Sequence, residues 1–271
     1  GYFWTANPEW TPALARRRRG TDWVTTVRTL PPDAPGRKAY VRFLEERYGE
    51  DASRFREAYG LDARDGFAAI DYGTLDPERP AVAADDLDFL GRIAERYYGV
   101  IGPLTRELAP GRLILGERYA LRDLPRPVLE AALPHIDVLS LQQIAIDFEA
   151  EAIDALHETT GKPVLIADHG VAYPTEEHPL TVWEDVEDAA AVGRAYRRFL
   201  DDAFARSYFV GYLRCQYVDR PAGNRLRQGV LRADGTPRAE IAAAMRAANL
   251  AVAAGLDAGA GASPVEEEED G

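Results

Sequence analysis

The sequence predicts a parallel α/β fold, and two patterns predict it. Five short apolar stretches alternate along the chain with longer stretches of helical periodicity, which is the order of a parallel sheet with crossover helices. The fourth apolar stretch, residues 163–166, has no polar position, so both of its faces are expected to be covered. No glycine-rich phosphate loop follows any of these stretches, so a nucleotide-binding sheet has no support in the sequence.

The predicted strands are short, and each is followed by polar residues. The first is recognised by its run of aromatic residues, Tyr2 to Trp4. The fourth leads into Asp168 and His169, and the fifth into Arg214. The five predicted strands occupy residues 1–4, 113–116, 136–141, 163–166 and 208–213.

Helical periodicity is strongest over residues 85–108, where apolar side chains recur at spacings of three and four before a Pro-Gly pair ends the helix. The amphipathic stretch 37–59 is interrupted by Gly49, and residues 60–83 have the character of a loop. Gly161 is expected to cap the helix before it. Further predicted helices occupy residues 127–133, 148–159, 183–205 and 239–254.

Composition and charge argue against several classes of partner. The chain has 271 residues and a formal net charge of −13, so phosphates would be repelled over most of its surface and no nucleic-acid partner is expected. The basic run from Arg16 to Arg19 is expected to be a solvated helix end or loop. No apolar run approaches the roughly 20 residues that a membrane span needs. The single cysteine, Cys215, rules out an internal disulfide.

The two ends of the chain differ from its middle. Residues 255–271 are rich in Gly and Ala and then acidic, so this tail is expected to be disordered and residues 1–254 to form the folded domain. The chain begins without Met, so it is expected to be the back part of a longer protein, and the absence of a signal peptide therefore means little. The cellular compartment stays open.

Several motifs, taken in order and with their spacing, resemble a known enzyme family. They are Gly1-Tyr2-Phe3 with Trp10, and the segments 30–36, 43–49, 115–118, 137–140, 162–166, 216–221 and 228–231. Over residues 1 to about 250 they resemble agarase-like and β-galactosidase-like glycoside hydrolases of the retaining clan, whose fold is a (β/α)8 TIM barrel. In that family Gly-Tyr-Phe lies on barrel strand 4. The resemblance therefore implies that this chain holds strands 4 to 8 and that an upstream barrel half or a homo-oligomer completes the barrel.

The resemblance also implies where catalytic groups lie. Retaining glycosidases use two carboxyl groups about 5–5.5 Å apart, as acid/base and nucleophile. In the family these are glutamates at the tips of strands 4 and 7. The first position aligns with Asn7, which cannot donate a titrating proton, and the second with Asp168, whose carboxylate is shorter by one methylene. Glu9 is an alternative acid/base if its loop shifts, and Glu117 ends the second predicted strand.

Other strand tips supply candidates for substrate binding. Arg214 stands where the family often has a tryptophan, and its planar guanidinium fits the carboxylate or sulfate of an anionic sugar. The alternative for Arg214 is an ion pair with Asp168 or another carboxylate. The other candidates for substrate binding are Trp4, Asn7, Arg118, Tyr119, Gln142, Gln143, His169 and Gln216.

His169 has two interpretations. Near the cavity it would be a general acid or base at neutral pH, whereas strand alternation would turn it away from Asp168 to the other face of the sheet. No His, Asp or Glu set has the spacing of metal ligands, and no cofactor is expected. Cys215 is expected to be a packing residue and not a nucleophile.

Three functional hypotheses remain. The first is a glycoside hydrolase acting on a poly- or oligosaccharide, with an anionic one as an option. The second is a catalytically degenerate barrel that binds sugar or acts as a scaffold for a partner, because Asn7, Asp168 and Arg214 all differ from the family pattern. The third is a barrel repurposed for other chemistry, with Asp168, Glu117 or His169 as its acid/base.

Overall fold

The computed structural model describes residues 1–6, 8–49, 52–61, 67, 70–122, 124–182 and 184–260. The chain divides into two compact units, Gly1–Val138 and Leu139–Gly271. Each unit contains parallel strands joined through helices, so the prediction of a parallel α/β fold is confirmed.

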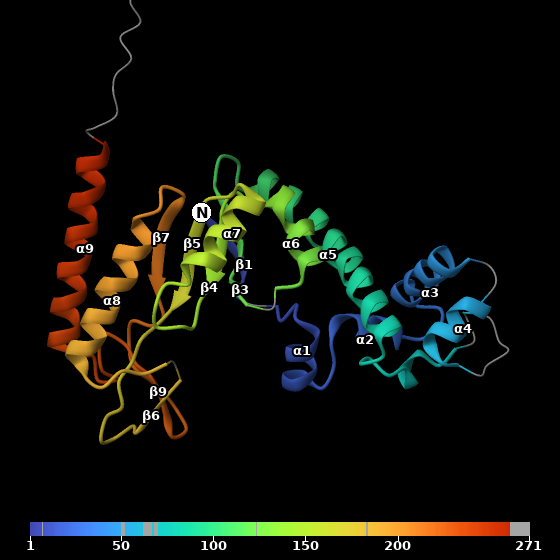
Figure 1. Cartoon of the computed structure of the whole chain (residues 1–271), viewed down its shortest axis with the longest axis horizontal. Helices are drawn as coiled ribbons and strands as arrows, with labels where there is room; N and C mark the ends of the chain where they lie inside the picture. Colours follow the sequence, from blue (N-terminus) through green and yellow to red (C-terminus); the bar gives the residue numbers. More distant parts are fainter. Residues whose placement is uncertain are drawn as a thin grey trace, which may run out of the picture. The chain divides into compact units, whose positions relative to one another are not determined.

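The first unit is organised around one parallel strand pair and one long helix. β1 (Tyr2–Thr5) pairs with β2 (Ile114–Glu117), and α5 (Pro80–Leu108) precedes β2. The Trp4 indole of β1 donates a hydrogen bond of 2.8 Å to Thr105 Oγ1 of α5. The other elements are α1 (Pro12–Arg19), α2 (Trp23–Arg28), α3 (Pro35–Tyr48), α4 (Ser53–Tyr59), the short 3-10 helix η2 (Tyr72–Thr74), β3 (Tyr119–Ala120), α6 (Arg126–Ala132) and the 3-10 helix η3 (Leu133–His135). Helices α2, α3 and α4 gather at one end of α5 (Figure 1).

The second unit contains a parallel sheet with β5 (Val164–His169) between β4 (Leu139–Gln142) and β7 (Phe209–Arg214). A small second sheet has the order β6-β9-β8. The other elements are α7 (Ala150–Thr160), β6 (Leu180–Thr181), α8 (Ala189–Phe204), β8 (Arg220–Ala222), β9 (Arg225–Arg227) and α9 (Ala239–Ala260).

Helices α8 and α9 lie side by side (Figure 1). Their backbones approach closely because α8 has a glycine at the contact, where a Cβ on Gly193 would lie 2.6 Å from the Cβ of Ala244. The Tyr196 hydroxyl of α8 also donates a 2.7 Å hydrogen bond to Asn249 Oδ1 of α9. This pair of helices forms one wall of a cavity described below.

Most predicted elements appear, with shifted ends. All five predicted strands form, and β5 continues through Asp168 and His169, so both residues lie inside the strand. The stretch 37–59 forms two helices separated near Gly49, and Gly161 caps α7 with a positive φ of 63°. The arginine run Arg16–Arg19 forms the last turn of α1. The structure also contains β3, β6, β8 and β9, which the sequence patterns did not indicate because each has only two or three residues.

Two predicted boundaries were wrong. The helix expected over 183–205 begins at Ala189, because the Asp188 side chain accepts a hydrogen bond from the Ala191 amide and caps the helix there. The last helix was expected to end near residue 254, but α9 continues to Ala260. The remaining tail, 261–271, lies outside the described residues.

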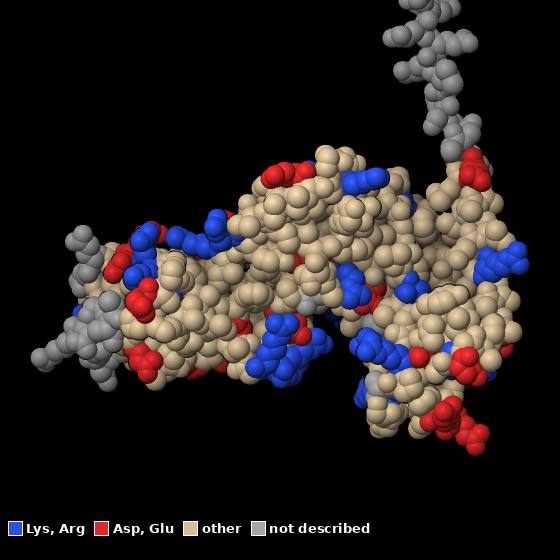
Figure 2. Space-filling view, turned by 180° about the vertical axis from the view of Figure 1, so that it is seen from behind, with Lys and Arg blue, Asp and Glu red and all other residues tan. Residues whose placement is uncertain are grey.

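One described helix, residues Ala239–Asp257 of α9, has the length and apolar composition of a membrane span, which the sequence analysis did not anticipate. A single helix of this kind is weak evidence, since core helices of water-soluble proteins pass the same test. On the face shown in Figure 2, basic side chains form small groups among acidic ones and do not form one continuous patch.

A buried polar network fixes α5 against the helices at its end. Asp85 and Asp86 are nearly inaccessible to solvent. Asp85 Oδ2 accepts hydrogen bonds from two tyrosine hydroxyls, those of Tyr48 and Tyr59, each 2.7 Å long. Asp86 forms an ion pair with Arg28 and accepts a hydrogen bond of 2.7 Å from the Tyr40 hydroxyl. Buried charges of this kind hold a structure together only while every partner is present.

We expect Asp86→Ala to lower the free energy of unfolding by about 3–5 kcal/mol, because it leaves the buried Arg28 guanidinium without its carboxylate. Asp88→Ala is the matched control two residues away. Asp88 forms a half-exposed pair with Arg47, so its loss should cost about 0–1 kcal/mol. Urea unfolding of the three proteins measures both values, and equal losses for the two variants would contradict the network described here.

Candidate functional site

Strand register decides which side chains share a face of the β4-β5-β7 sheet. Leu141, Ile166 and Tyr212 are neighbours in register, and the Tyr212 ring packs against Phe199 of α8. This face is therefore the helix-covered face. The register then shifts, so that Gln142, which follows Leu141 directly and points to the other face, pairs with Asp168 and not with Ala167. Asp168 shares the face of Gln142.

The Asp168 carboxylate lies at the C-terminal end of β5, on the face opposite α8. Its Oδ2 accepts a 2.8 Å hydrogen bond from the Gln142 side-chain amide, so two predicted site residues are brought together. Asp168 is 4% exposed. In parallel α/β barrels, functional groups gather at this end of the strands. Asp168 is therefore the first component of the candidate site.

His169 lies on the helix-covered face. Its ring stacks on Phe199 of α8, with centroids 4.0 Å apart, and it is fully buried. Nε2 contacts the Ala145 carbonyl oxygen at 3.0 Å, and because that oxygen only accepts, Nε2 carries the proton. Nδ1 therefore accepts from the Tyr212 hydroxyl at 2.8 Å. Burial lowers the pKa of His169 to about 4, so the ring is neutral at neutral pH.

Gln143 and Gln216 hold loops and are not brought to Asp168 by their side chains. Gln143 Nε2 donates to the Asp147 carbonyl, and Gln143 Oε1 accepts from the Glu149 amide at 3.4 Å. Gln216 Nε2 donates to the Arg227 carbonyl of β9 at 3.0 Å. The predicted ion pair between Arg214 and Asp168 is not formed, because register places Arg214 beside His169 on the helix-covered face.

In the first unit, Glu117 ends β2 inside an aromatic enclosure. Its Oε2 accepts hydrogen bonds from the Trp10 indole and the Tyr98 hydroxyl, each 2.8 Å long. Glu117 is fully buried, and its Oε1 has no hydrogen-bond partner within the part of the chain that the structure describes. Burial raises the pKa of the Glu117 carboxyl, and the hydrogen bonds from Trp10, Tyr98 and Tyr97 only partly offset that rise.

The other predicted residues of the first unit have different environments. Glu9 pairs with two arginines of α1, Arg18 and Arg19, at 3.1 and 2.5 Å. Trp4 lies against Tyr98, with ring centroids 5.7 Å apart, and Tyr119 is 1% exposed. The Arg118 amide donates to the Ala6 carbonyl at 2.9 Å, which joins the two strand ends. Asn7 lies outside the described residues.

Sequence reasoning missed the residues that hold these carboxyl and imidazole groups. Trp10 was quoted only as part of a motif, and Tyr98 is adjacent to a stripe residue of the predicted helix, although both donate to Glu117. Tyr212, whose hydroxyl donates to Nδ1 of His169, lies in a strand with no distinguishing pattern. A buried glutamate needs donors, but the sequence does not say which tyrosines face it. No cluster of potential metal ligands occurs among the described residues.

Comparisons with known proteins agree with the resemblance seen in the motifs. No protein-family model matches the chain. The chain is 28% identical over 222 residues to Beta-agarase A of Vibrio sp. (strain JT0107), an alignment that covers 78% of this chain and 21% of the agarase. It therefore spans about a fifth of that curated relative.

Solved structures show the same fold. An agarase named AgWH50C matches with a TM-score of 0.75 and 19% identity, covering 93% of this chain and 36% of that one. An exo-beta-agarase matches with a TM-score of 0.71 and 23% identity, covering 84% and 32%. The chain thus resembles part of an agarase-like glycoside hydrolase and shares the mixed α/β fold of TIM-barrel-type agarases.

We expect His169 to stay uncharged between about pH 5 and 8, because its pKa is about 4 in the folded protein. Its pKa is about 6.5 when unfolded. The folded state therefore binds fewer protons, and the stability that His169 contributes is complete above about pH 6.5 and is lost as the pH falls towards 4. Imidazole NMR shifts against pH, with His169→Gln to assign the signal, measure this pKa. A midpoint near 6.5 would contradict the buried neutral ring.

Glu117 should make the free energy of unfolding depend on pH in the opposite direction from His169. Its folded pKa is raised above an unfolded value of about 4.3, so its contribution is most favourable at low pH and is lost as the pH rises through the folded pKa. Glu117→Gln keeps an oxygen for Trp10 and Tyr98 and removes the titration. We expect the free energy of unfolding of wild type, relative to the variant, to fall from pH 4.5 to pH 7. A constant difference would show that Glu117 does not titrate in this range.

Proposed function

We propose that this chain is the C-terminal part of a glycoside-hydrolase barrel that acts on a poly- or oligosaccharide. Its parallel strands β1, β2, β4, β5 and β7 would be barrel strands 4 to 8, and an upstream segment would supply the others. The similarity to Beta-agarase A and to solved agarases supports this proposal, and it points to a galactan as the first substrate to test.

One observation carries the proposal. Asp168 lies at the C-terminal end of β5 on the face opposite the helices, which is where a barrel strand presents its catalytic group. The Gln142 amide bound to Oδ2 holds the carboxylate in one orientation.

In this proposal Asp168 is the nucleophile. Its carboxylate oxygen would attack the anomeric carbon, the C–O bond to the leaving group would break, and water would later release the glycosyl ester. Glu117, in the other unit of the chain, is a candidate acid by itself, because burial raises the pKa of its carboxyl, which is the direction that a general acid needs. Glu9 is less suited, since two arginines compensate its charge.

A second candidate function is sugar binding without hydrolysis. One observation favours it: Glu117 is fully enclosed by Trp10, Tyr98 and their neighbours, so substrate reaches it only if these side chains move. The third hypothesis, a barrel repurposed for other chemistry around Asp168, Glu117 or His169, has less support from His169. The His169 ring lies on the helix-covered face, and both of its nitrogens are occupied.

In the full-length protein, we expect Asp168→Asn to lower turnover of aryl β-galactosides and agarose by about 10⁴-fold or more, the scale of loss when one member of a nucleophilic catalytic unit is removed. The matched control is Asp201→Asn on the outer surface of α8, where the carboxylate pairs only locally with Arg197. Release of the aryl group and of reducing ends measures the rates.

Equal turnover by wild type and Asp168→Asn would remove Asp168 as nucleophile. No turnover by wild type, together with saturable binding of agaro-oligosaccharides that Gln142→Ala weakens, would favour the sugar-binding function over hydrolysis.

A further inference from the structure

A cavity of about 640 Å³ lies between β7 and the helices α8 and α9. Arg214, the last residue of β7, lines it together with Tyr196 of α8 and Asn249 of α9. Because Arg214 shares the helix-covered face with His169, this cavity is on the other side of the sheet from Asp168. It is therefore separate from the sugar site proposed above.

The guanidinium of Arg214 is only partly satisfied. Nη2 donates to the Val171 carbonyl oxygen at 2.8 Å. Nε and Nη1 are buried, and neither has a hydrogen-bond partner within the residues described. Among those residues no carboxylate forms an ion pair with Arg214. A buried donor without a partner destabilises the folded protein, and more so when it is charged.

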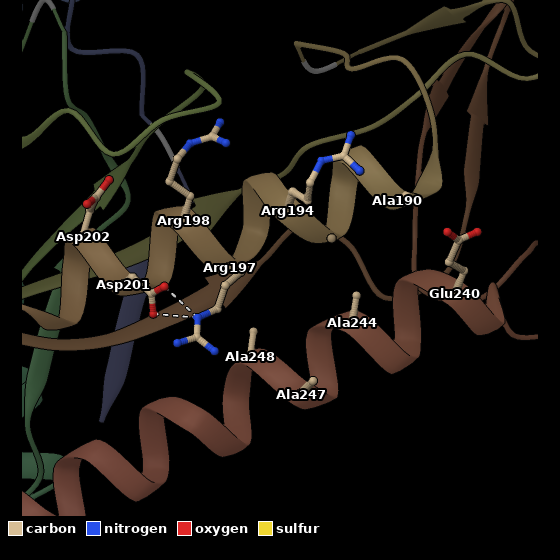
Figure 3. Close-up of a pocket in the computed structure, with 11 residues that line it drawn as sticks. Ala190, Arg194, Arg197, Arg198, Asp201, Asp202, Glu240, Ala244, Ala247 and Ala248 are labelled. Carbon is tan, nitrogen blue, oxygen red and sulfur yellow. Dashed lines mark hydrogen bonds and ion pairs between the residues drawn. The ribbon is translucent and has the colours of Figure 1, made fainter.

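Three arginines of α8 have the carboxylate partner that Arg214 lacks within the described part of the chain. A neighbouring cavity of about 750 Å³ lies between α8 and α9, and three arginines of α8 line it (Figure 3). Each of the three has its own carboxylate. The pairs are Arg194 with Glu187, Arg197 with Asp201, and Arg198 with Asp147. Arg214 differs from all three.

The lining of the Arg214 cavity also contains no acidic side chain. Its polar groups are the hydroxyls of Tyr196, Tyr212 and Tyr217, the side-chain amides of Asn249 and Gln216, and a second cation, Arg246. The Tyr212 hydroxyl already contacts His169 and the Arg214 guanidinium. The Tyr196 and Gln216 donors already point to Asn249 and to the Arg227 carbonyl. Two positive charges without a carboxylate between them favour an anionic ligand.

We propose that this cavity binds a small oxyanion, a sulfate or a carboxylate, with Arg214 as its principal ligand. The two unused donors of one guanidinium, Nε and Nη1, suit the paired oxygens of such a group. Tyr217, which is 68% exposed at the rim, is the side chain that would turn to admit it. The proposal is independent of hydrolysis at Asp168.

The test compares two anions with an uncharged sugar. The 271-residue chain is titrated by calorimetry, in a buffer of constant ionic strength, with sodium sulfate, galacturonate and galactose. We expect one site for an anion and none for galactose. Arg214→Gln should weaken anion binding at least tenfold, whereas Arg227→Gln, which removes an exposed arginine of nearby β9, should leave it unchanged. Tighter binding of sulfate or of galacturonate tells whether the natural ligand is a sulfate ester or a sugar acid.

A thermal readout shows whether loss of binding reflects misfolding. Sulfate stabilises proteins in general, so its effect on Tm is compared between variants. We expect sulfate to raise the Tm of wild type and Arg227→Gln more than that of Arg214→Gln, with Arg214→Lys intermediate because it keeps the charge and loses the fork. Absence of anion binding by wild type, or equal binding and equal Tm shifts in wild type and Arg214→Gln, would overturn the proposal.

Discussion

The parallel register of β4, β5 and β7 is the constraint on which the functional geometry depends. A parallel sheet sends successive side chains of one strand to opposite faces, and the hydrogen-bonded neighbours share that orientation. Asp168 and His169 are adjacent in sequence, yet Asp168 joins Gln142 and His169 joins Tyr212 and Phe199. One carboxylate therefore faces away from the helices while the imidazole is part of the helix–sheet core.

Glu117 and Asp168, the two candidate carboxyl groups, are buried among different hydrogen-bond donors. Glu117 has only neutral donors around it, so its charged form is disfavoured and its pKa is raised. Asp168 has a fixed amide donor at one oxygen. His169 has a neutral ring, and both of its nitrogens are occupied.

Much of the fold could be predicted because periodicity and apolar runs are local signals. The run 163–166 marked a covered strand, and the stripe within 85–108 marked a long helix. Strand ends and helix starts depended on single side chains, such as Asp188 at the start of α8, which periodicity does not report. The partners of Glu117 and Arg214 come from distant segments and from the exact register, so residue type alone left their environments open.

The most direct test of Asp168 as the nucleophile is covalent trapping. The full-length protein is incubated with 2,4-dinitrophenyl 2-deoxy-2-fluoro-β-galactoside, whose fluorine slows breakdown of the glycosyl ester, and its peptides are analysed by mass spectrometry. We expect one fluorogalactosyl adduct on the peptide that contains Asp168. We also expect the release of one equivalent of dinitrophenol. An adduct on Glu117 or Glu9, or steady hydrolysis of galactosides with no adduct on Asp168, would contradict the role assigned to this carboxylate.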